Sequence, residues 1–100
     1  MIDIDEKTLG EIKFVLKKNL KDIPAKTYFF GSRVNGKARK YSDVDIAISA
    51  KKQIPFDVMA RIDFEFEMSL ISYIVDVIDL NATSENFIKH IEKDLVEFSY

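Results

Sequence analysis

Two aspartates at the start of a short apolar run limit what this chain can fold into. Asp43 and Asp45 flank Val44, and the run continues to Ile48, a pattern typical of a buried strand. Side chains alternate along a strand, so both carboxylates point to the same side, with their Cα atoms roughly 6.6 Å apart. Two like charges so close repel each other unless a positive partner lies between them. The pattern therefore predicts an open strand end that can hold a cation such as Mg²⁺. A solvated aspartate pair in a turn is the simpler alternative.

Length and charge exclude several other classes of protein. The chain has 100 residues with 47% hydrophobic composition, which predicts one domain, residues 1–100, around one core. It has no cysteine, no signal-peptide pattern and no apolar stretch near the ~20 residues that span a bilayer, so we expect a soluble cytoplasmic protein without a membrane partner. The net charge of −2 gives no global field toward nucleic acid, and we expect no direct nucleic-acid binding.

The order of helical and strand patterns indicates an α/β (α+β) fold. Apolar residues at helical spacing alternate with short β-branched and aromatic runs, which predicts a small mixed sheet with helices packed on it. The predicted elements are a helix over Asp5–Leu20, a strand over Lys26–Phe30, a turn and short helix after Gly31, a strand over Val44–Ile48, a helix over Phe56–Ser72, a strand over Tyr73–Leu80, a helix over Glu85–Leu95, and a tail over Val96–Tyr100 that forms an edge strand or packs loosely.

A third carboxylate falls within the predicted third strand. Asp76 interrupts the apolar run Ile74–Ile78, where a buried charge needs a partner or a metal ion, although a position facing water at a sheet edge is also compatible with the pattern. Asp79 lies three residues further on and so on the opposite face of the strand. We take Asp76 as the third site residue because apolar residues flank it on both sides, and Asp79 remains its rival.

A glycine and a serine follow the first predicted strand directly. Gly31 allows close approach of the backbone to a ligand, and the exposed N–H groups and hydroxyl of Ser32 can bind phosphate oxygens, although an ordinary turn with Ser32 as helix cap has the same pattern. Four basic residues lie between this turn and the aspartate pair and would place positive charge near a polyphosphate: Arg33, Lys37, Arg39 and Lys40. Gly31, Ser32 and Arg33 are therefore the predicted nucleotide-binding residues.

These residues together resemble a known family. The pattern Gly-Ser-Arg-x-x-Gly-x-Ala-Arg-x-x-Ser-Asp-x-Asp over residues 31–45, with a later strand carrying a third carboxylate, is similar to the signature of the DNA polymerase β-like nucleotidyltransferase superfamily. More narrowly, it resembles the minimal nucleotidyltransferases, the MNT family, over nearly the whole chain. Val34 departs from the small residue, often alanine, that the family has after the arginine.

The resemblance implies roles for the individual residues. Asp43, Asp45 and Asp76 would be catalytic and would bind two Mg²⁺ ions, and Gly31 and Ser32 would hold the β- and γ-phosphates of a nucleoside triphosphate such as ATP. An acceptor hydroxyl would attack the α-phosphorus, and pyrophosphate would leave.

The resemblance also implies a partner. Members of the MNT family occur beside helical HEPN-type proteins and can act as antitoxins, in some cases by adding AMP to a tyrosine of the HEPN toxin. We therefore expect a nucleotidyltransferase with a HEPN-type partner, in a homo- or hetero-oligomer. The alternative is a catalytically silent nucleotide-binding subunit that neutralises a helical partner by direct binding.

Overall fold

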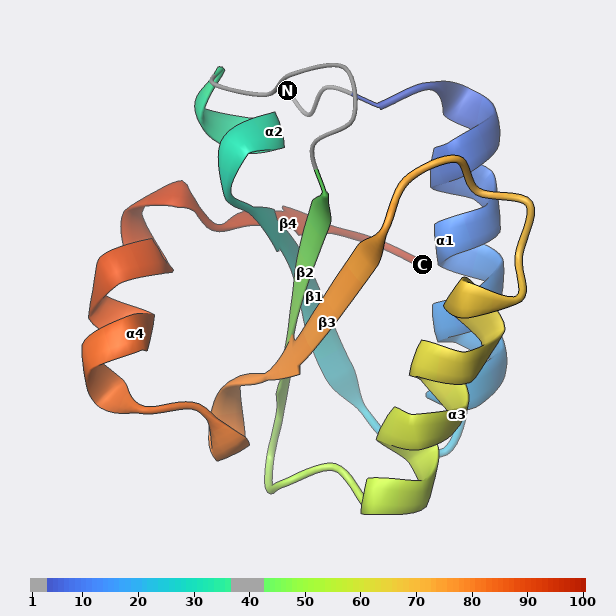
Figure 1. Ribbon diagram of the computed structural model, residues 1–100. Helices are drawn as coiled ribbons and strands as arrows, with labels where there is room; N and C mark the ends of the chain where they lie inside the picture. Colours follow the sequence, from blue (N-terminus) through green and yellow to red (C-terminus); the bar gives the residue numbers. More distant parts are fainter. Residues whose placement is uncertain (1–3, 37–42) are drawn as a thin grey trace.

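The computed structural model describes residues 4–36 and 43–100 of the chain. Its helices and strands follow one another in a mixed order that matches the predicted class (Figure 1). The elements are α1 (Glu6–Asn19), β1 (Ala25–Phe30), α2 (Ser32–Asn35), β2 (Val44–Ala50), α3 (Phe56–Glu67), β3 (Val75–Asp79), the 3₁₀ turn η1 (Leu80–Ala82), α4 (Glu85–Ile91), the 3₁₀ turn η2 (Glu92–Asp94) and β4 (Val96–Phe98).

A mixed sheet of four strands in the order β3-β2-β1-β4 forms the centre of the described structure. β1 is antiparallel to both β2 and β4, whereas β2 and β3 are parallel. A parallel pair needs a crossover connection, and α3 supplies it between these two strands. β3 and β4 are consequently the two edge strands, and β3 is outermost in Figure 1.

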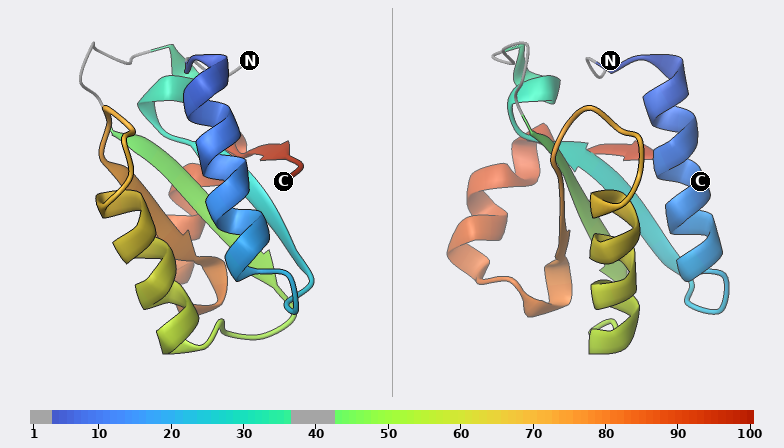
Figure 2. Two further views of the ribbon diagram at one scale, coloured as in Figure 1. Left: turned by 90° about the vertical axis from the view of Figure 1, so that its right-hand side faces the viewer. Right: turned by 45° about the vertical axis from the view of Figure 1, so that its right-hand side comes forward.

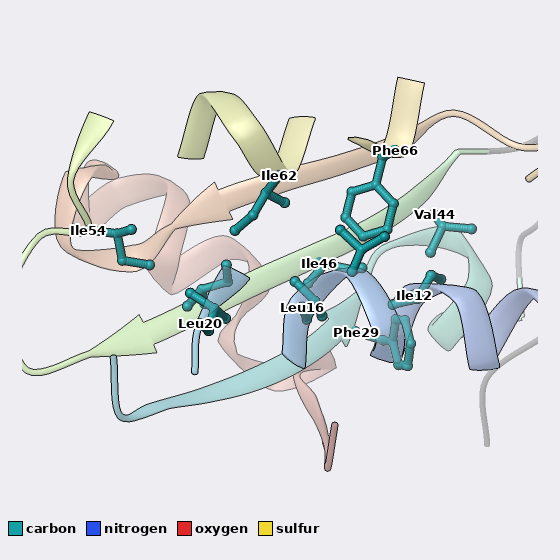
Figure 3. Packing of buried hydrophobic residues seen from close by; sticks show 11 residues of the cluster. Ile12, Leu16, Leu20, Phe29, Val44, Ile46, Ile54, Ile62 and Phe66 are labelled. Carbon is teal, nitrogen blue, oxygen red and sulfur yellow. The ribbon is translucent and has the colours of Figure 1, made fainter. Parts of the chain in front are cut away.

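Helices α1 and α3 cover one face of the sheet and enclose the main core. Alternate residues of β2 point into this layer, and side chains at helical spacing on α1 meet them (Figure 3). The helices are also joined at the surface, where Lys18 Nζ lies 3.4 Å from Glu65 Oε1. The buried members of this core are Ile12, Val15, Leu16, Leu20, Phe29, Val44, Ile46, Ile48, Ile54, Ile62 and Phe66.

Helix α4 covers part of the opposite face of the sheet, as the two views in Figure 2 show. Ser84 is the N-cap of this helix, and its Oγ accepts a hydrogen bond from the Phe87 N–H at 3.3 Å. Ile91 packs with Phe30 of β1 and Ala47 of β2 in a second, smaller cluster. Since α4 is short, it leaves space on this face toward the beginning of β2.

The predicted fold class and element order are confirmed, and the differences lie at element ends. α3 ends at Glu67, five residues before the predicted end at Ser72. Ser69 explains the early end, because its hydroxyl donates to the Phe66 carbonyl at 2.7 Å and accepts from the Ile71 N–H at 3.3 Å. The tail does form an edge strand, β4, and the ring of Phe98 stacks on that of Phe29 with centroids 4.0 Å apart.

The outer surfaces of α1 and α3 are partly apolar. Phe14, Phe64 and Met68 are each at least 60% exposed and line a groove of about 820 Å³ between the two helices. Within the part of the chain that the structure describes, no helix combines the length and apolar composition needed to cross a membrane.

Candidate active site

The strand register brings two of the predicted aspartates side by side. In the parallel pairing of β2 with β3, Asp45 is the partner of Asp76, and in the antiparallel pairing of β1 with β2, Asp45 is also the partner of Phe30. Asp43 immediately precedes β2. Gly31 follows Phe30 directly, so the ends of three strands meet at this point.

The alternation of side chains separates Asp76 from its rival. Val75 and Val77 point toward the α1 and α3 layer, whereas Asp76 and Ile78 point to the face that α4 partly covers. Asp79 lies on the first of these faces and is 6% exposed. One of its carboxylate oxygens accepts from the Ile54 N–H at 2.7 Å, and the other accepts from the Asn81 N–H at 2.9 Å. The structure thus places Asp76, and not Asp79, beside Asp45.

Burial and nearby negative charges act on the carboxyl groups of Asp45 and Asp76. Burial, followed by the charges of Asp76 and Asp43, raises the pKa of Asp45 to about 6. Burial, a hydrogen bond to Asp43 and the charges of Asp43 and Asp63 raise the pKa of Asp76. A hydrogen bond between two carboxyl groups needs a shared proton. The arrangement therefore favours a positive species, either a proton or a metal cation, among these oxygens.

Gly31 brings the backbone against the carboxylate of Asp45. Its φ of 83° lies in the left-handed region, and a Cβ at this position would collide with Asp45 Oδ2. The Gly31 carbonyl accepts hydrogen bonds from the N–H groups of Val34 and Asn35 at 3.0 and 3.1 Å, so α2 begins directly after the glycine. Ser32, the first residue of α2, directly follows the glycine that lies against Asp45.

Arg33, which the sequence predicts to bind the nucleotide, is buried. Its side chain is 4% exposed, and its guanidinium carbon lies 4.1 Å from the centroid of the Tyr73 ring. This cation–π contact joins α2 to the segment that leads into β3. Among the other basic residues predicted near a polyphosphate, Lys37, Arg39 and Lys40 lie outside the described residues.

An open cleft of about 860 Å³ runs beside these carboxylates. Four acidic side chains line it, from Asp45, Asp63, Glu67 and Asp76, and none of its described lining residues is basic. Asp63 and Glu67 were missed in the sequence analysis. Their spacing of four residues places them on one side of α3, but no sequence pattern shows that this side faces β3.

The donor set suits a hard cation. Carboxylate oxygens are the ligands that Mg²⁺ takes, and it commonly uses one or two of them together with water and substrate phosphates. Over residues 4–36 and 43–100, no three acidic, histidine or cysteine side chains are already arranged as a metal site. Asp43, Asp45 and Asp76 therefore fit a magnesium ion by their chemistry and by their mutual repulsion, with further ligands supplied by a substrate or by water.

Comparison with known proteins shows which family the chain belongs to. The family model "Polymerase beta, Nucleotidyltransferase" matches residues 10–97. The chain is 37% identical over 92 residues to MntA of Haemophilus influenzae, which is named a probable protein adenylyltransferase, and this match covers 92% of the chain and 79% of the relative. It is 33% identical over 97 residues to a candidate protein adenylyltransferase of Methanocaldococcus jannaschii, covering 90% of the chain and 97% of the relative.

Solved structures show the same fold. A chain in the crystal structure of a toxin–antitoxin complex with AMP-PNP superposes with a TM-score of 0.72 at 22% identity, covering 91% of this chain and 73% of that one. A chain in the complex of tri-AMPylated Shewanella oneidensis HEPN toxin with MNT antitoxin superposes with a TM-score of 0.69 at 19% identity, covering 97% and 74%. Fold, family model and sequence identity agree, and the chain belongs to the polymerase β-type nucleotidyltransferase family, among the relatives of MntA.

Proposed function

We propose that this protein is a Mg²⁺-dependent adenylyltransferase that moves AMP from ATP onto a tyrosine hydroxyl of a HEPN-type toxin and thereby acts as its antitoxin. One observation carries the proposal: Asp45 and Asp76 are register partners on adjacent parallel strands, and Gly31, which Ser32 follows directly, lies against the Asp45 carboxylate. The names of the relatives support the reaction, because the H. influenzae protein is called a protein adenylyltransferase and the S. oneidensis complex holds an AMPylated toxin.

Each site residue has a distinct part in the proposed reaction. Asp43 and Asp45 would hold the metal, with Asp76 completing the site, and Gly31 and Ser32 would hold the terminal phosphates of ATP. Bound Mg²⁺ supplies positive charge to the phosphate oxygens and to the three carboxylates. Asp76 is the exposed member of the set, so it borders the place where an acceptor enters and can take up the hydroxyl proton. A bond forms from the acceptor oxygen to the α-phosphorus, and the bond from that phosphorus to the bridging oxygen breaks, releasing pyrophosphate.

A mass measurement on the partner tests this proposal. The protein is incubated with its HEPN-type partner, Mg²⁺ and each nucleoside triphosphate in turn, and the partner is weighed by mass spectrometry. We expect a gain of one or more AMP units with ATP, and no gain with an Asp43→Asn/Asp45→Asn variant. Asp22→Asn is the matched control, because Asp22 is exposed at the opposite end of β1, and it should transfer AMP like the unmodified protein.

The mass measurement, combined with an assay of toxin neutralisation, also tests a second candidate function. The exposed Phe14, Phe64 and Met68 along the groove between α1 and α3 favour direct binding to a helical partner. In this second function the protein binds nucleotide without catalysis and neutralises its helical partner by direct binding. No adduct with any nucleotide, together with full neutralisation of the toxin by the Asp43→Asn/Asp45→Asn variant, would establish this alternative in place of the transferase.

A further inference from the structure

Among the described residues, only β2 pairs with β3, so the backbone of β3 has an open edge beside the carboxylates. The strand pairs with β2 on one side, where the Val44 N–H donates to the Ile74 carbonyl at 2.9 Å. In a parallel ladder, residues that bond to the neighbouring strand alternate with residues that point away from it. Ile74 and Asp76 therefore direct their backbone groups toward β2, and Val75 and Val77 direct theirs to the open edge. Figure 1 shows this strand as the outermost one in the sheet.

The cleft follows this edge and has acidic side chains on both of its sides. Asp76 lies on the face that α4 partly covers, with Asp45 one strand further in, and Asp63 and Glu67 belong to α3 on the other face. A polypeptide strand added to β3 would run between Asp76 and the pair on α3. Its side chains would alternate, so one set would meet Asp76 and the other set would meet Asp63 and Glu67.

From this geometry we propose that the open edge of β3 binds the acceptor polypeptide as an added strand, and that the reacting hydroxyl residue has a basic neighbour on each side. The inference rests on the proposed transferase function and names its substrate class. An extended segment gains backbone hydrogen bonds from Val75 and Val77, as in other cases of strand addition. When its hydroxyl residue lies beside Asp76, the residues before and after it point to the side of Asp63 and Glu67. Charge complementarity selects lysine or arginine at those positions.

Apolar residues complete the acceptor pattern. Ile74, which directly precedes β3, and Ile78 lie two residues to either side of Asp76 and share its face by alternation, and Ile74 is 66% exposed. Phe87 of α4, which is 41% exposed, lines the same cleft. Residues two positions before and after the reacting hydroxyl therefore meet apolar surface. The expected acceptor is an extended segment of the pattern apolar-basic-hydroxyl-basic-apolar.

A scan of backbone methylation tests the added strand without any need for catalysis. The probe is a capped, fluorescent peptide, Ile-Lys-Tyr-Lys-Ile, and its binding to the full-length protein with Mg²⁺ and AMP-PNP is measured by anisotropy. We expect N-methylation at alternate residues to weaken binding about tenfold or more, because each methyl group removes one hydrogen bond to the edge and obstructs approach. N-methylation at the intervening residues should change binding by less than about twofold. Absence of binding, or equal effects at all positions, would overturn the proposal.

A charge reversal tests the predicted side-chain selection. An Asp63→Lys/Glu67→Lys variant should bind the lysine peptide about tenfold more weakly and should recover affinity for the same peptide with glutamate in place of lysine. Asp57→Lys, at the far end of α3, is the matched control and should bind the lysine peptide as the unmodified protein does. Equal affinity of the double variant and the unmodified protein for the lysine peptide would contradict the charge argument.

The two proposals fail in different ways. If N-methylation weakens peptide binding at alternate residues only, but no partner gains AMP, the strand-binding edge is supported and the transferase function is refuted. AMP transfer to the HEPN-type partner without peptide binding at β3 would establish the transferase and refute the added strand.

Discussion

Asp76 and Asp79 show how strongly the position on a strand decides the role of a carboxylate. They lie on one five-residue strand and on opposite faces of it. Asp79 is enclosed and accepts backbone hydrogen bonds from Ile54 and Asn81, so it fixes the connection between β2 and α3 and the turn after β3. Asp76 lies beside Asp45 and Asp43, where burial, a hydrogen bond to Asp43 and like charges raise its pKa. One aspartate is therefore placed to stabilise the fold, and the other to act on a ligand.

The first prediction separates these two roles. Asp79→Ala should lower the free energy of unfolding by about 1–3 kcal/mol, because the buried Ile54 N–H loses its acceptor. Asp76→Ala should leave the free energy of unfolding unchanged or raise it, because like-charge repulsion is removed, while AMP transfer is lost. Urea denaturation and the partner mass assay measure both quantities. A destabilised Asp76→Ala protein together with an unaffected Asp79→Ala protein would reverse the assignment.

The second prediction concerns the pH dependence of stability in metal-free buffer. Since the pKa of Asp45 is raised to about 6 in the folded protein, above about 3.9 in the unfolded chain, the folded state binds more protons between these values. The free energy of unfolding therefore falls as pH rises through this window. Above the window, the destabilisation caused by the ionised Asp45 carboxylate is fully present. Asp45→Asn removes the cost, so its gain in melting temperature should be largest near about pH 7.5 and vanish near about pH 4. A gain independent of pH would show that the charge of Asp45 is not its cause.

At the scale of the element, α2 is held from two directions. Gly31 takes a left-handed conformation against Asp45, and Arg33 packs over Tyr73 in the segment before β3. The sequence motif predicts the glycine turn, because its type and position are local. It does not predict the contact of Arg33 with Tyr73, forty residues away in the chain, because only the parallel pairing of β2 with β3 brings these segments together. The end of α3 was not predicted for a different reason: apolar residues continue past it through Leu70 and Ile71.

The third prediction concerns the close approach at Gly31. Gly31→Ala should destabilise the protein by more than the roughly 1–2 kcal/mol of a left-handed conformation, because the added methyl group also collides with the Asp45 carboxylate. Gly36→Ala is the matched control, since Gly36 has a φ of 80° but nothing near its missing Cβ, and it should show the conformational cost alone. Equal losses in urea denaturation would mean that Asp45 moves away freely.

The fourth prediction concerns the contact between Arg33 and Tyr73. Tyr73→Leu removes the aromatic ring and should cost about 0.5–2 kcal/mol of stability. Because α2 then loses its support, the KM for ATP should rise more than kcat falls. Tyr73→Phe retains the ring and should behave like the unmodified protein in both measurements. A Tyr73→Phe protein as impaired as Tyr73→Leu would show that the hydroxyl group, and not the ring, is responsible.

At the scale of the whole molecule, the arrangement of layers places the reactive groups. The helices α1 and α3 bury one face of the sheet, and the short α4 leaves open the end of the other face where β1, β2 and β3 meet. Element order and class were predictable because periodicity and turn residues are local signals. Sheet order, the acidic side of α3 and the open edge of β3 depend on tertiary pairing. The cleft could therefore not be predicted, although two of its four acidic lining residues, Asp45 and Asp76, were predicted from the sequence.

The most direct test of the proposed site is calorimetric titration of AMP-PNP into the protein, with Mg²⁺ and then with the metal removed by EDTA. The unmodified protein and the Asp22→Asn control should bind the nucleotide with Mg²⁺ and lose at least about tenfold in affinity without it, because Asp43 and Asp45 repel the phosphates when no cation lies between them. Asp45→Asn should bind weakly under both conditions. Equal affinity with and without Mg²⁺, or unchanged Mg²⁺-dependent binding by Asp45→Asn, would contradict the assignment of these aspartates to a magnesium–nucleotide site.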